Sequence, residues 1–395
     1  MELIFKQNPW WFLDEWENED KHIKEWKKEK YRWYPKWISK ISLEPFSLNF
    51  VYGARQTGKT TGVKLLIKKL IKANVEAKAI FYFDFEMISS LKELRKILQW
   101  YIEEKKREKI PTAYIFLDEV SSIEEWFRIV KFFIDQGSFE DDIITVLGSS
   151  TLGIIKAPER FSGRKGRGKI LEILPLSFPE FIEVHGYKKK EILYNSEILK
   201  ELWEKYKVTG GFPRAINQKE DAFDTLISGI VSEIYKHKKS LGISQDILAS
   251  LLTKIPSPLS YYSIAQDVGI SHKTVREYIE FFKDSLLLEL AYWKSNGANP
   301  RKEKKIFFRD PFILRAISFW TSTKFLESAL YEGIVQEHLL RKFNEIYYFR
   351  NSFEIDCIAG DLKIEVKAGK PHRKYPRNVL ILEEDDIPRF LVEEK

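Results

Sequence analysis

The chain has 395 residues, more than one hydrophobic core usually organises, so we expect two to four domains. Its 65 basic and 58 acidic residues give a net charge of +7, a mild bias that permits nucleic-acid binding without requiring it. The single cysteine, Cys357, excludes an intramolecular disulfide and a paired-cysteine metal site. No segment has the pattern of a signal peptide or a membrane span, which predicts a cytoplasmic protein with no membrane partner.

Residues 1–45 are rich in tryptophan and lysine, and a helix is predicted from Asp20 to Arg32. We expect a helical arm whose aromatic side chains pack on the next domain. A surface on which nucleic-acid bases stack is the alternative.

Residues 46–180 alternate apolar, strand-like runs with helical patterns. This alternation implies an α/β core with a parallel sheet and helices on both faces. The strands are expected at 46–51, 79–84, 113–117, 143–147 and 169–174.

A P-loop pattern follows the first of these strands. The residues fit G-x-x-x-x-G-K-[ST] without deviation, and a helix is predicted to begin directly after them. In such a loop, backbone N–H groups and the positive end of the helix dipole face phosphate oxygens. Lys59 would reach the β- and γ-phosphates, and the Thr60 hydroxyl would ligate Mg²⁺. The residues expected to contact the nucleotide are Gly53, Ala54, Arg55, Gln56, Thr57, Gly58, Lys59, Thr60 and Thr61.

The third strand ends in two carboxylates, Asp118 and Glu119. Asp118 can hold Mg²⁺ through water, and Glu119 can orient and polarise the attacking water. A strand end with solvated acids is the alternative, which the P-loop makes less favoured. No [NT]-K-x-D guanine pattern follows, so ATP is favoured over GTP.

Three further groups are candidates for contacts with the phosphates. Ser149 or Ser150, at the end of the fourth strand, can place a polar side chain beside the γ-phosphate, and the sequence does not choose between them. Arg164 or Arg167, in a glycine-rich basic loop, can stabilise transferred charge, in cis or from a neighbouring chain in an oligomer. Arg214 can touch phosphate from a helical lid. For each arginine a solvated basic residue is the alternative.

Residues 181–240 have a helical pattern, broken at Gly210-Gly211-Phe212-Pro213, and we interpret them as the helical lid. Residues 241–305 are predicted to form a winged helix-turn-helix, with helices at 245–254, 261–268 and 272–283. Its wing would pair residues 286–292 with 305–308, and the segment 299–305 is a candidate domain boundary.

The third of these helices has the features of a recognition helix. Ser271 is a good N-cap, and the first two turns carry His272, Lys273, Thr274 and Arg276, positions from which such a helix reaches DNA. A winged helix used only for packing or protein contacts is the alternative.

Residues 306–395 contain a predicted hairpin around Gly360-Asp361. Counting from the turn places Asp356 directly across from Glu365, with Lys367 on the same face. Two opposed carboxylates repel each other, and a divalent cation, Mg²⁺ or Mn²⁺, would reverse the sign of that interaction. Lys367 could then position water beside the metal. An ordinary charged solvent face is the alternative.

This arrangement resembles the PD-(D/E)xK nuclease motif, with Ile355 in place of the proline. That resemblance implies a restriction-endonuclease-like α/β domain. Glu337, on a helix predicted at 332–343, matches the acidic residue that such nucleases often supply from their first helix.

Taken together, the motifs resemble the AAA+-related ATPases that carry a winged helix and a C-terminal nuclease-like domain. The resemblance covers about residues 46–395 and includes Pro175-Leu-Ser-Phe-Pro-Glu-Phe181 and Gly210-Gly-Phe-Pro-Arg-Ala. It implies an ATPase core, a helical lid and a DNA-associated C-terminal half, within an α/β multidomain fold.

Two functions follow. The first is a Mg²⁺-dependent ATPase that acts on DNA, with Asp356, Glu365 and Lys367 as a metal-dependent nuclease centre. The second is an ATP-controlled switch whose C-terminal half binds DNA or protein without cutting.

Overall fold

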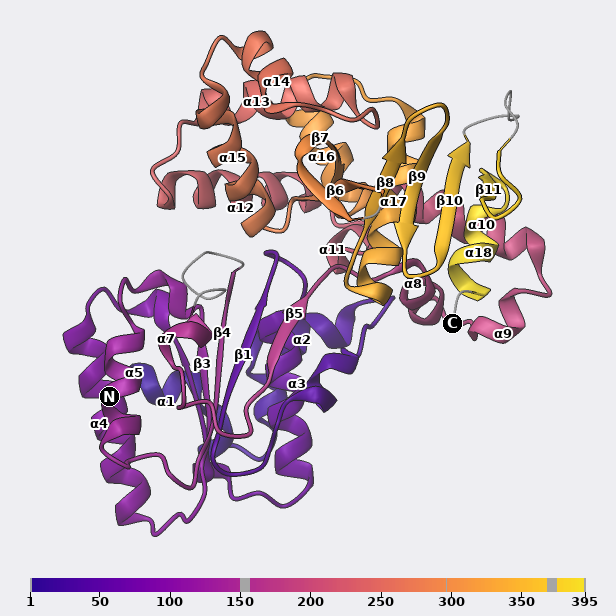
Figure 1. Cartoon of the computed structure of the whole chain (residues 1–395). Coiled ribbons are helices and arrows are strands. Elements are labelled where there is room, and N and C mark those ends of the chain that lie inside the picture. The colour runs from indigo at the N-terminus through magenta and orange to yellow at the C-terminus, as the bar shows by residue number, and fades with distance from the viewer. Residues whose placement is uncertain (1, 150–156, 296, 368–374, 394–395) are drawn as a thin grey trace. The chain divides into compact units, whose positions relative to one another are not determined.

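The computed structural model describes residues 2–149, 157–295, 297–367 and 375–393. The chain divides into two compact units, Met1–Leu174 and Pro175–Lys395 (Figure 1). None of the helices in the described residues is long and apolar enough to cross a membrane.

The first unit is built on a five-stranded, fully parallel sheet, as predicted. The strand order is β2-β3-β4-β1-β5, so β1 lies between β4 and β5. The strands are apolar along most of their length because both faces of the sheet are covered. They span Ser47–Gly53 (β1), Ile80–Asp84 (β2), Tyr114–Asp118 (β3), Ile143–Ser149 (β4) and Ile170–Ile173 (β5).

Helices cover both faces of this sheet (Figure 1). One face packs against α1 (Glu2–Gln7), α4 (Leu91–Arg107) and α5 (Phe127–Asp135). The other packs against α2 (Lys21–Lys28) and α3 (Lys59–Lys72). A short helix, α7 (Ala157–Arg160), precedes β5.

The tryptophan-rich arm packs on this sheet, which confirms the first of the two interpretations. Trp10 and Trp16 are buried against the face covered by α2 and α3. The indole N–H groups of Trp10 and Trp11 both donate to the Ile80 carbonyl, at 3.0 and 2.9 Å. The arm thereby supplies hydrogen-bond partners to β2, the strand at the edge of the sheet.

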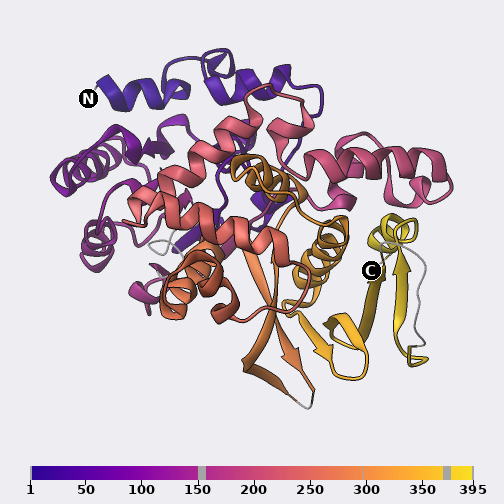
Figure 2. The ribbon, with the colours of Figure 1, turned by 90° about the horizontal axis from the view of Figure 1, so that it is seen from above.

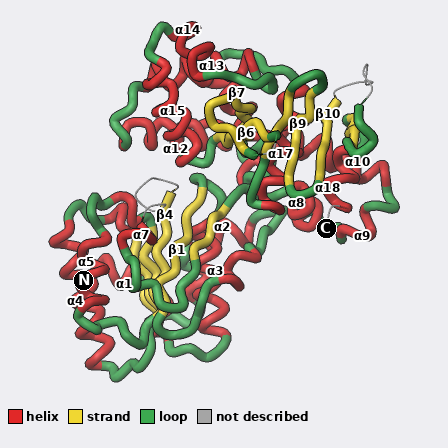
Figure 3. The backbone as a smooth tube through the Cα atoms, in the orientation of Figure 1, coloured by secondary structure: helices red, strands yellow, loops and turns green. Residues whose placement is uncertain are grey.

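The second unit combines helices with a six-stranded mixed sheet of order β11-β10-β9-β8-β6-β7 (Figure 3). Its strands are Leu288–Lys294 (β6), Ala298–Phe308 (β7), Tyr347–Arg350 (β8), Glu354–Ala359 (β9), Leu362–Lys367 (β10) and Leu380–Glu383 (β11). Helix α17 (Glu327–Phe343) packs against β7, β9 and β10.

The remaining helices of this unit are Phe178–Val184 (α8), Lys189–Ile192 (α9), Ser196–Thr209 (α10), Pro213–Ile216 (α11), Ala222–Lys236 (α12), Leu241–Lys254 (α13), Tyr261–Val268 (α14), His272–Asp284 (α15), Pro311–Trp320 (α16) and Ile387–Glu393 (α18). Helix α10 packs against α16 and α18. The helices predicted as a separate lid thus belong to the same compact unit as the C-terminal residues.

The predicted boundary at 299–305 is wrong, because these residues lie within β7. Strands β6 and β7 pair as a hairpin, as expected for the wing (Figure 2). However, β6 also pairs with β8, so the hairpin is part of the C-terminal sheet. The run of lysine and arginine that suggested a linker is the exposed outer half of a strand.

Candidate functional site

The P-loop lies at the carboxyl end of β1, where the chain turns sharply into α3. Gln56 and Gly58 both have positive φ, 65° and 81°, and the Gly58 carbonyl starts the helix by accepting from Gly62 N at 2.8 Å. Gly53 approaches β5 so closely that an added Cβ would lie 2.1 Å from the Ile173 carbonyl oxygen. The first glycine of the motif is therefore required by its packing against β5.

The side chains of the loop are held close to its own backbone. The Lys59 ammonium donates to the carbonyls of Gly53 and Ala54, at 2.8 and 2.9 Å, and the Thr57 hydroxyl donates to Ala54 at 2.9 Å. Lys59 is buried, whereas Thr60 and Thr61 are half-buried at the first turn of α3. The lysine and the threonines are thus at the positive end of the helix, where a phosphate chain would lie.

Asp118 and Glu119 stand at the end of β3, as predicted. Asp118 is buried, and its Oδ1 accepts from Glu119 N at 2.9 Å. Glu119 adopts a left-handed backbone conformation, with φ 43°, which is uncommon for a residue with a side chain. Its Oε2 accepts from Ser149 N at 3.2 Å. Burial raises the pKa of Glu119, and the positive charge of Lys59 opposes that rise, so these two groups lie within reach of each other's charge.

Tyr82 was missed by the sequence analysis, although it holds Asp118 in place. Its buried hydroxyl donates to Asp118 Oδ2 at 2.9 Å. The backbone of Tyr82 is in turn fixed by Asn8, whose side-chain amide bonds its N–H and C=O at 2.7 and 2.9 Å. Tyr82 lies in an apolar β-strand pattern, so nothing in the sequence marks it as polar machinery.

The neighbouring strand end adds a third carboxylate. Asp84 is paired with Asp118 in the register of β2 and β3. Burial, together with the negative charge of Asp118, raises the pKa of Asp84 to about 6. A divalent cation beside Asp84 and Asp118 would relieve the repulsion between them.

The other side chains predicted to contact phosphate have less direct connections to the P-loop and Glu119. Ser149 lies at the end of β4 and contacts Glu119 through its backbone, while Ser150 lies outside the described residues. Arg164 forms an ion pair with Asp135, and Arg167 pairs with Glu44 at 2.8 Å. Both arginines belong to the first unit and are engaged at its surface.

Arg214 belongs to the second unit, where it forms an ion pair with Asp221 at 2.5 Å. Its predicted contact with phosphate stays a prediction.

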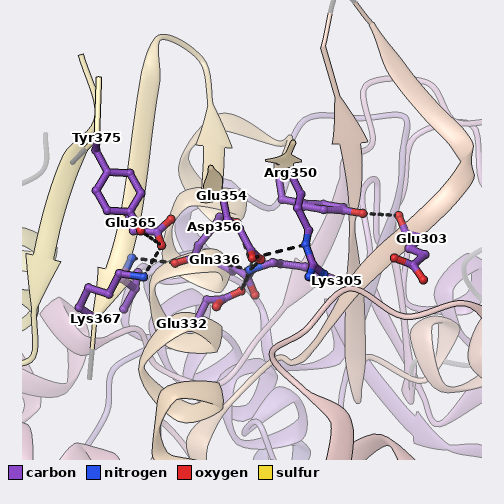
Figure 4. A network of polar contacts seen from close by, with 12 residues as sticks. Glu303, Lys305, Glu332, Gln336, Arg350, Glu354, Asp356, Glu365, Lys367 and Tyr375 are labelled. Carbon is purple, nitrogen blue, oxygen red and sulfur yellow. Dashed lines mark hydrogen bonds and ion pairs between the residues drawn. The ribbon is translucent and has the colours of Figure 1, made fainter. Parts of the chain in front are cut away.

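A second polar centre lies in the other unit, on the hairpin of β9 and β10. The paired register of this hairpin runs from Leu362 and Ala359 to Ile364 and Cys357, and Glu365 and Asp356 are the residues that follow this last pair on the two strands. Asp356 and Glu365 are both nearly fully buried. Asp356 Oδ2 accepts from Val366 N at 2.9 Å. Glu365 Oε1 accepts from Lys367 and, at 2.8 Å, from the Tyr375 hydroxyl (Figure 4).

The charged groups of this hairpin shift one another's pKa values. Burial, and then the negative charge of Asp356, raise the pKa of Glu365. Burial would lower the pKa of Lys367, but its hydrogen bonds to Glu365 and Tyr375 outweigh burial and raise it to about 12. Lys367 is therefore a permanent cation beside these two carboxylates at neutral pH.

The sequence also predicted no role for Lys305 on β7, which lies in the middle of this polar cluster. Its ammonium is 2.9 Å from Glu332, 2.8 Å from Glu354 and 2.5 Å from Asp356 (Figure 4). Burial alone would lower the pKa of Lys305, but the three carboxylates raise it well above its ordinary value. Burial, and then Asp356, raise the pKa of Glu332.

The structure places Glu337 away from this centre, so its prediction as a metal ligand is wrong. Glu337 is buried in ion pairs with Arg309, at 3.0 Å, and Arg341, at 2.8 Å. The residues of α17 that face the centre are Glu332 and Gln336, whose amide donates to Glu332 at 2.8 Å. Glu337 follows Glu332 by five positions in the helix, which rotates its side chain by roughly 140° about the helix axis. The two side chains therefore point to different faces.

Within the described residues, no group of three or more His, Cys, Asp or Glu side chains is arranged to hold a metal ion. The centre nevertheless contains one polar atom without a hydrogen-bond partner in the described part of the chain, the buried Oε2 of Glu365. That atom, with Asp356, fits the oxygen-rich coordination that Mg²⁺ or Mn²⁺ prefers.

The three helices predicted as a helix-turn-helix are present as α13, α14 and α15. Ser271 caps α15 by accepting from Thr274 N at 3.1 Å. His272, Lys273 and Arg276 are exposed on its first two turns, and Thr274 is half-buried. A short backbone bridge between Leu259 and Lys304, with N–O distances of 2.8 and 2.9 Å, joins the turn before α14 to β7.

Comparison with known proteins supports the interpretation of the first unit. Residues 46–182 match a family model described as an AAA domain, and residues 200–324 match a domain of unknown function. Residues 46–182, which carry the P-loop, are therefore similar to AAA domains.

Two relatives are similar over most of the chain, and both are uncharacterized. One, from Methanocaldococcus jannaschii, is 26% identical over 80% of this chain and 73% of its own length. The other, from Haemophilus influenzae, is 24% identical over 87% of this chain and 88% of its own length.

Solved structures show more distant likeness. The Aeropyrum pernix ORC2 protein in ADPNP–ADP complexes has a TM-score of 0.41 and 13% identity, and covers 70% of this chain and 88% of its own. A Thermotoga maritima RuvB variant has a TM-score of 0.32 and 17% identity, and covers 66% and 84%. At TM-scores below 0.5 these likenesses say nothing of substrate or partner.

Proposed function

We propose that this chain binds and hydrolyses ATP with Mg²⁺ and uses the cycle to act on DNA. The observation that carries the ATPase part is the joint placement of Lys59, Asp118 and Glu119 at the carboxyl ends of parallel strands. Lys59 starts α3, Asp118 is held by Tyr82, and Glu119 is tied to β4 through Ser149 N. This is the arrangement that phosphoryl transfer needs, because catalysis there is mainly positioning and charge stabilisation.

Each residue has a role that its surroundings support. Lys59 would leave the carbonyls of Gly53 and Ala54 for the β- and γ-phosphates. Thr60 and Asp118 would hold Mg²⁺, which when bound neutralises charge on the phosphate oxygens. Glu119, with a pKa raised by burial, would orient the attacking water and take up its proton.

Three residues complete the proposal for the nucleotide site. Ser149 would place its hydroxyl beside the γ-phosphate, and its backbone N–H already donates to Glu119. Arg164 would stabilise the transferred charge after leaving Asp135, within the chain or towards a neighbour in an oligomer. The predicted contact of Arg214 with phosphate would require its guanidinium group to leave Asp221.

For the DNA-binding part, the proposal rests on basic residues of the second unit. Lys273 and Arg276 are exposed on α15, and Arg301 and Lys302 are exposed on β7. A capped helix with basic residues on its first turns fits the major groove, while a basic hairpin fits the neighbouring phosphates.

The second unit would be a nuclease-like domain that works on phosphodiesters. Asp356 and Glu365 would hold one Mg²⁺ or Mn²⁺, and Lys367 would position water beside it. The support is the buried pair of carboxylates on the neighbouring strands, Asp356 and Glu365, with Lys367 two residues after Glu365. This is the order that the PD-(D/E)xK pattern requires.

The second candidate is an ATP-controlled switch whose C-terminal half binds DNA or protein without cutting. One observation favours it: Lys305 already forms ion pairs with Asp356, Glu332 and Glu354. A centre with its own internal cation can be purely structural.

Cleavage of supercoiled, linear and single-stranded DNA with Mg²⁺ or Mn²⁺, with and without ATP, separates the two candidates. The wild type is compared with Glu365→Gln, which keeps the shape but removes the charge, and with Asp361→Asn in the exposed turn of the same hairpin. The nuclease candidate predicts metal-dependent cutting that Glu365→Gln reduces at least about a hundredfold and Asp361→Asn leaves unchanged. No cutting of any substrate by the wild type favours the switch.

A further inference from the structure

Lys305 is an ammonium group in a place where an ammonium group is costly. Its side chain is 2% exposed, and it bridges three elements: β7, which carries it, α17 through Glu332, and β9 through Glu354 and Asp356. Burying a cation is unfavourable unless it is paired and fully hydrogen-bonded. Here three carboxylate oxygens lie within 2.9 Å of one nitrogen, which is a coordination shell rather than a simple ion pair.

The balance of charge among the innermost groups of the centre is negative even with Lys305 counted. Four carboxylates, those of Glu332, Glu354, Asp356 and Glu365, face two ammonium groups, those of Lys305 and Lys367. If all of them are ionised, two negative charges are in excess, which is the charge of one divalent cation; burial raises the pKa of Glu332 and Glu365 and so favours their protonated forms when no further cation is present. Among the described residues a further cation, Arg350, approaches Glu354 at 3.9 Å from the exposed rim.

The structure also has a place for that divalent cation. Glu365 is 2% exposed, and its Oε1 is held by Lys367 and Tyr375. Its Oε2 is buried and has no hydrogen-bond partner among the described residues. A buried carboxylate oxygen left without a donor is unfavourable, so this atom is the natural ligand for an added cation.

We infer that Lys305 takes the place of a metal ion: its ammonium fills a cation position formed by Glu332, Glu354 and Asp356, and so limits the centre to one divalent cation, bound at Asp356 and Glu365. The single bound cation rests on the proposed nuclease-like centre. The cation position filled by Lys305 does not, because its three carboxylates surround Lys305 whatever the centre does.

The test is the number of Mn²⁺ ions bound by the full chain without nucleotide, measured by titration calorimetry and electron paramagnetic resonance. Lys305→Met removes the charge and keeps the length of the side chain. Lys304→Met, the neighbour on β7, is the matched control. We expect Lys305→Met to bind one more Mn²⁺ per chain than the wild type, and Lys304→Met to bind the same number.

Stability provides the second readout. Without Lys305, three carboxylates face one another, so the thermal midpoint of Lys305→Met should rise when Mn²⁺ is added, more than that of the wild type or Lys304→Met. Adding Glu332→Gln to Lys305→Met should remove the extra ion.

The inference is overturned if Lys305→Met binds no extra Mn²⁺, or if it stays unfolded with Mn²⁺ present, since a divalent ion would replace the missing charge. A different result would contradict the proposed nuclease-like centre, namely that Glu365→Gln binds as many Mn²⁺ ions as the wild type. The comparison of Lys305→Met with the wild type remains decisive in that case.

Discussion

The hydroxyl of Tyr82 links the tryptophan-rich arm to Asp118, the carboxylate that we propose as a Mg²⁺ ligand. Asn8 fixes the backbone of Tyr82 through two hydrogen bonds, and Tyr82 donates to Asp118 Oδ2 at 2.9 Å. The arm therefore determines where a buried carboxylate points, although no part of residues 1–45 carries a nucleotide motif. Tyr82 is a positioning residue in this account.

Replacing Tyr82 by phenylalanine should weaken the use of Mg²⁺ without affecting metal-free ATP binding. Removing a hydrogen bond to a charged group costs about 1.5–3 kcal/mol, so the Mg²⁺ concentration needed for half-maximal hydrolysis should rise about ten- to a hundredfold. Tyr101→Phe is the control, because its buried hydroxyl donates to the Lys78 carbonyl instead. An equal Mg²⁺ requirement in Tyr82→Phe and Tyr101→Phe would show that Asp118 needs no such support.

Residues defined by a local pattern were predictable, and residues brought together by packing were not. The P-loop needs particular glycines at particular spacings, and the Gly360 turn sets the register that opposes Asp356 and Glu365. Lys305 and Tyr82 lie in strand patterns whose partners are 27 to 51 and 36 residues away in sequence. Nothing local identifies such partners.

Glu337 shows a different cause of error. The helix around it was predicted, but its orientation was not. Glu332 and Gln336, four residues apart, share the face that meets β9, while Glu337 points to Arg309 and Arg341. When most positions of a helix are buried, hydrophobic periodicity does not say which acidic residue faces which neighbour.

At the scale of elements, the P-loop helix α3 is fitted closely to the arm. A Cβ added at Gly62 would lie 2.3 Å from Cζ2 of Trp37, in the rigid ring of a half-buried side chain. The helix can therefore keep its position only with glycine here, despite the low helix propensity of glycine.

Gly62→Ala should lower the thermal midpoint, because overpacking costs about 1–3 kcal/mol. Gly242→Ala is the matched control: Gly242 is exposed in α13, and nothing lies within 4 Å of its added Cβ. That change should leave the midpoint unchanged or raise it, with a gain of about 0.4–1 kcal/mol in the free energy of unfolding. Calorimetry of the two variants checks this, and equal midpoints would contradict the close fit.

The element α15 carries the predicted contact with DNA. Replacing both Lys273 and Arg276 by alanine should weaken binding to all sequences and lower the salt slope by about 2, because each neutralised phosphate contributes about one unit to that slope. The control is the pair Lys92→Ala and Lys96→Ala, two exposed lysines on α4 whose removal changes the net charge equally. Fluorescence anisotropy at several salt concentrations measures the slope, and an unchanged slope in the α15 variant would exclude this helix.

At the scale of the whole molecule, five predicted segments become two compact units. The predicted boundary at 299–305 followed a run of charged residues, but β7 and β8 join one sheet through β6, and α10 packs on α16 and α18. Composition does not report such long-range pairing. The α/β core with its P-loop, in contrast, was predictable because its strands and its helices have different hydrophobic periods in the sequence.

The two units carry two distinct centres, one built on a P-loop and one on opposed carboxylates. We assign ATP to the first unit and DNA to the second. ATP hydrolysis at the first centre, with Glu119 activating the water, is the central requirement, since without hydrolysis the second centre would have no cycle to respond to.

The most direct test is ATP binding and steady-state hydrolysis, measured side by side for the wild type, Lys59→Ala and Glu119→Gln. We expect that Lys59→Ala no longer binds ATP tightly, and that Glu119→Gln binds ATP like the wild type but hydrolyses it at least about a hundredfold more slowly. Hydrolysis by Glu119→Gln at the wild-type rate, or no Mg²⁺-dependent hydrolysis by the wild type, would contradict it.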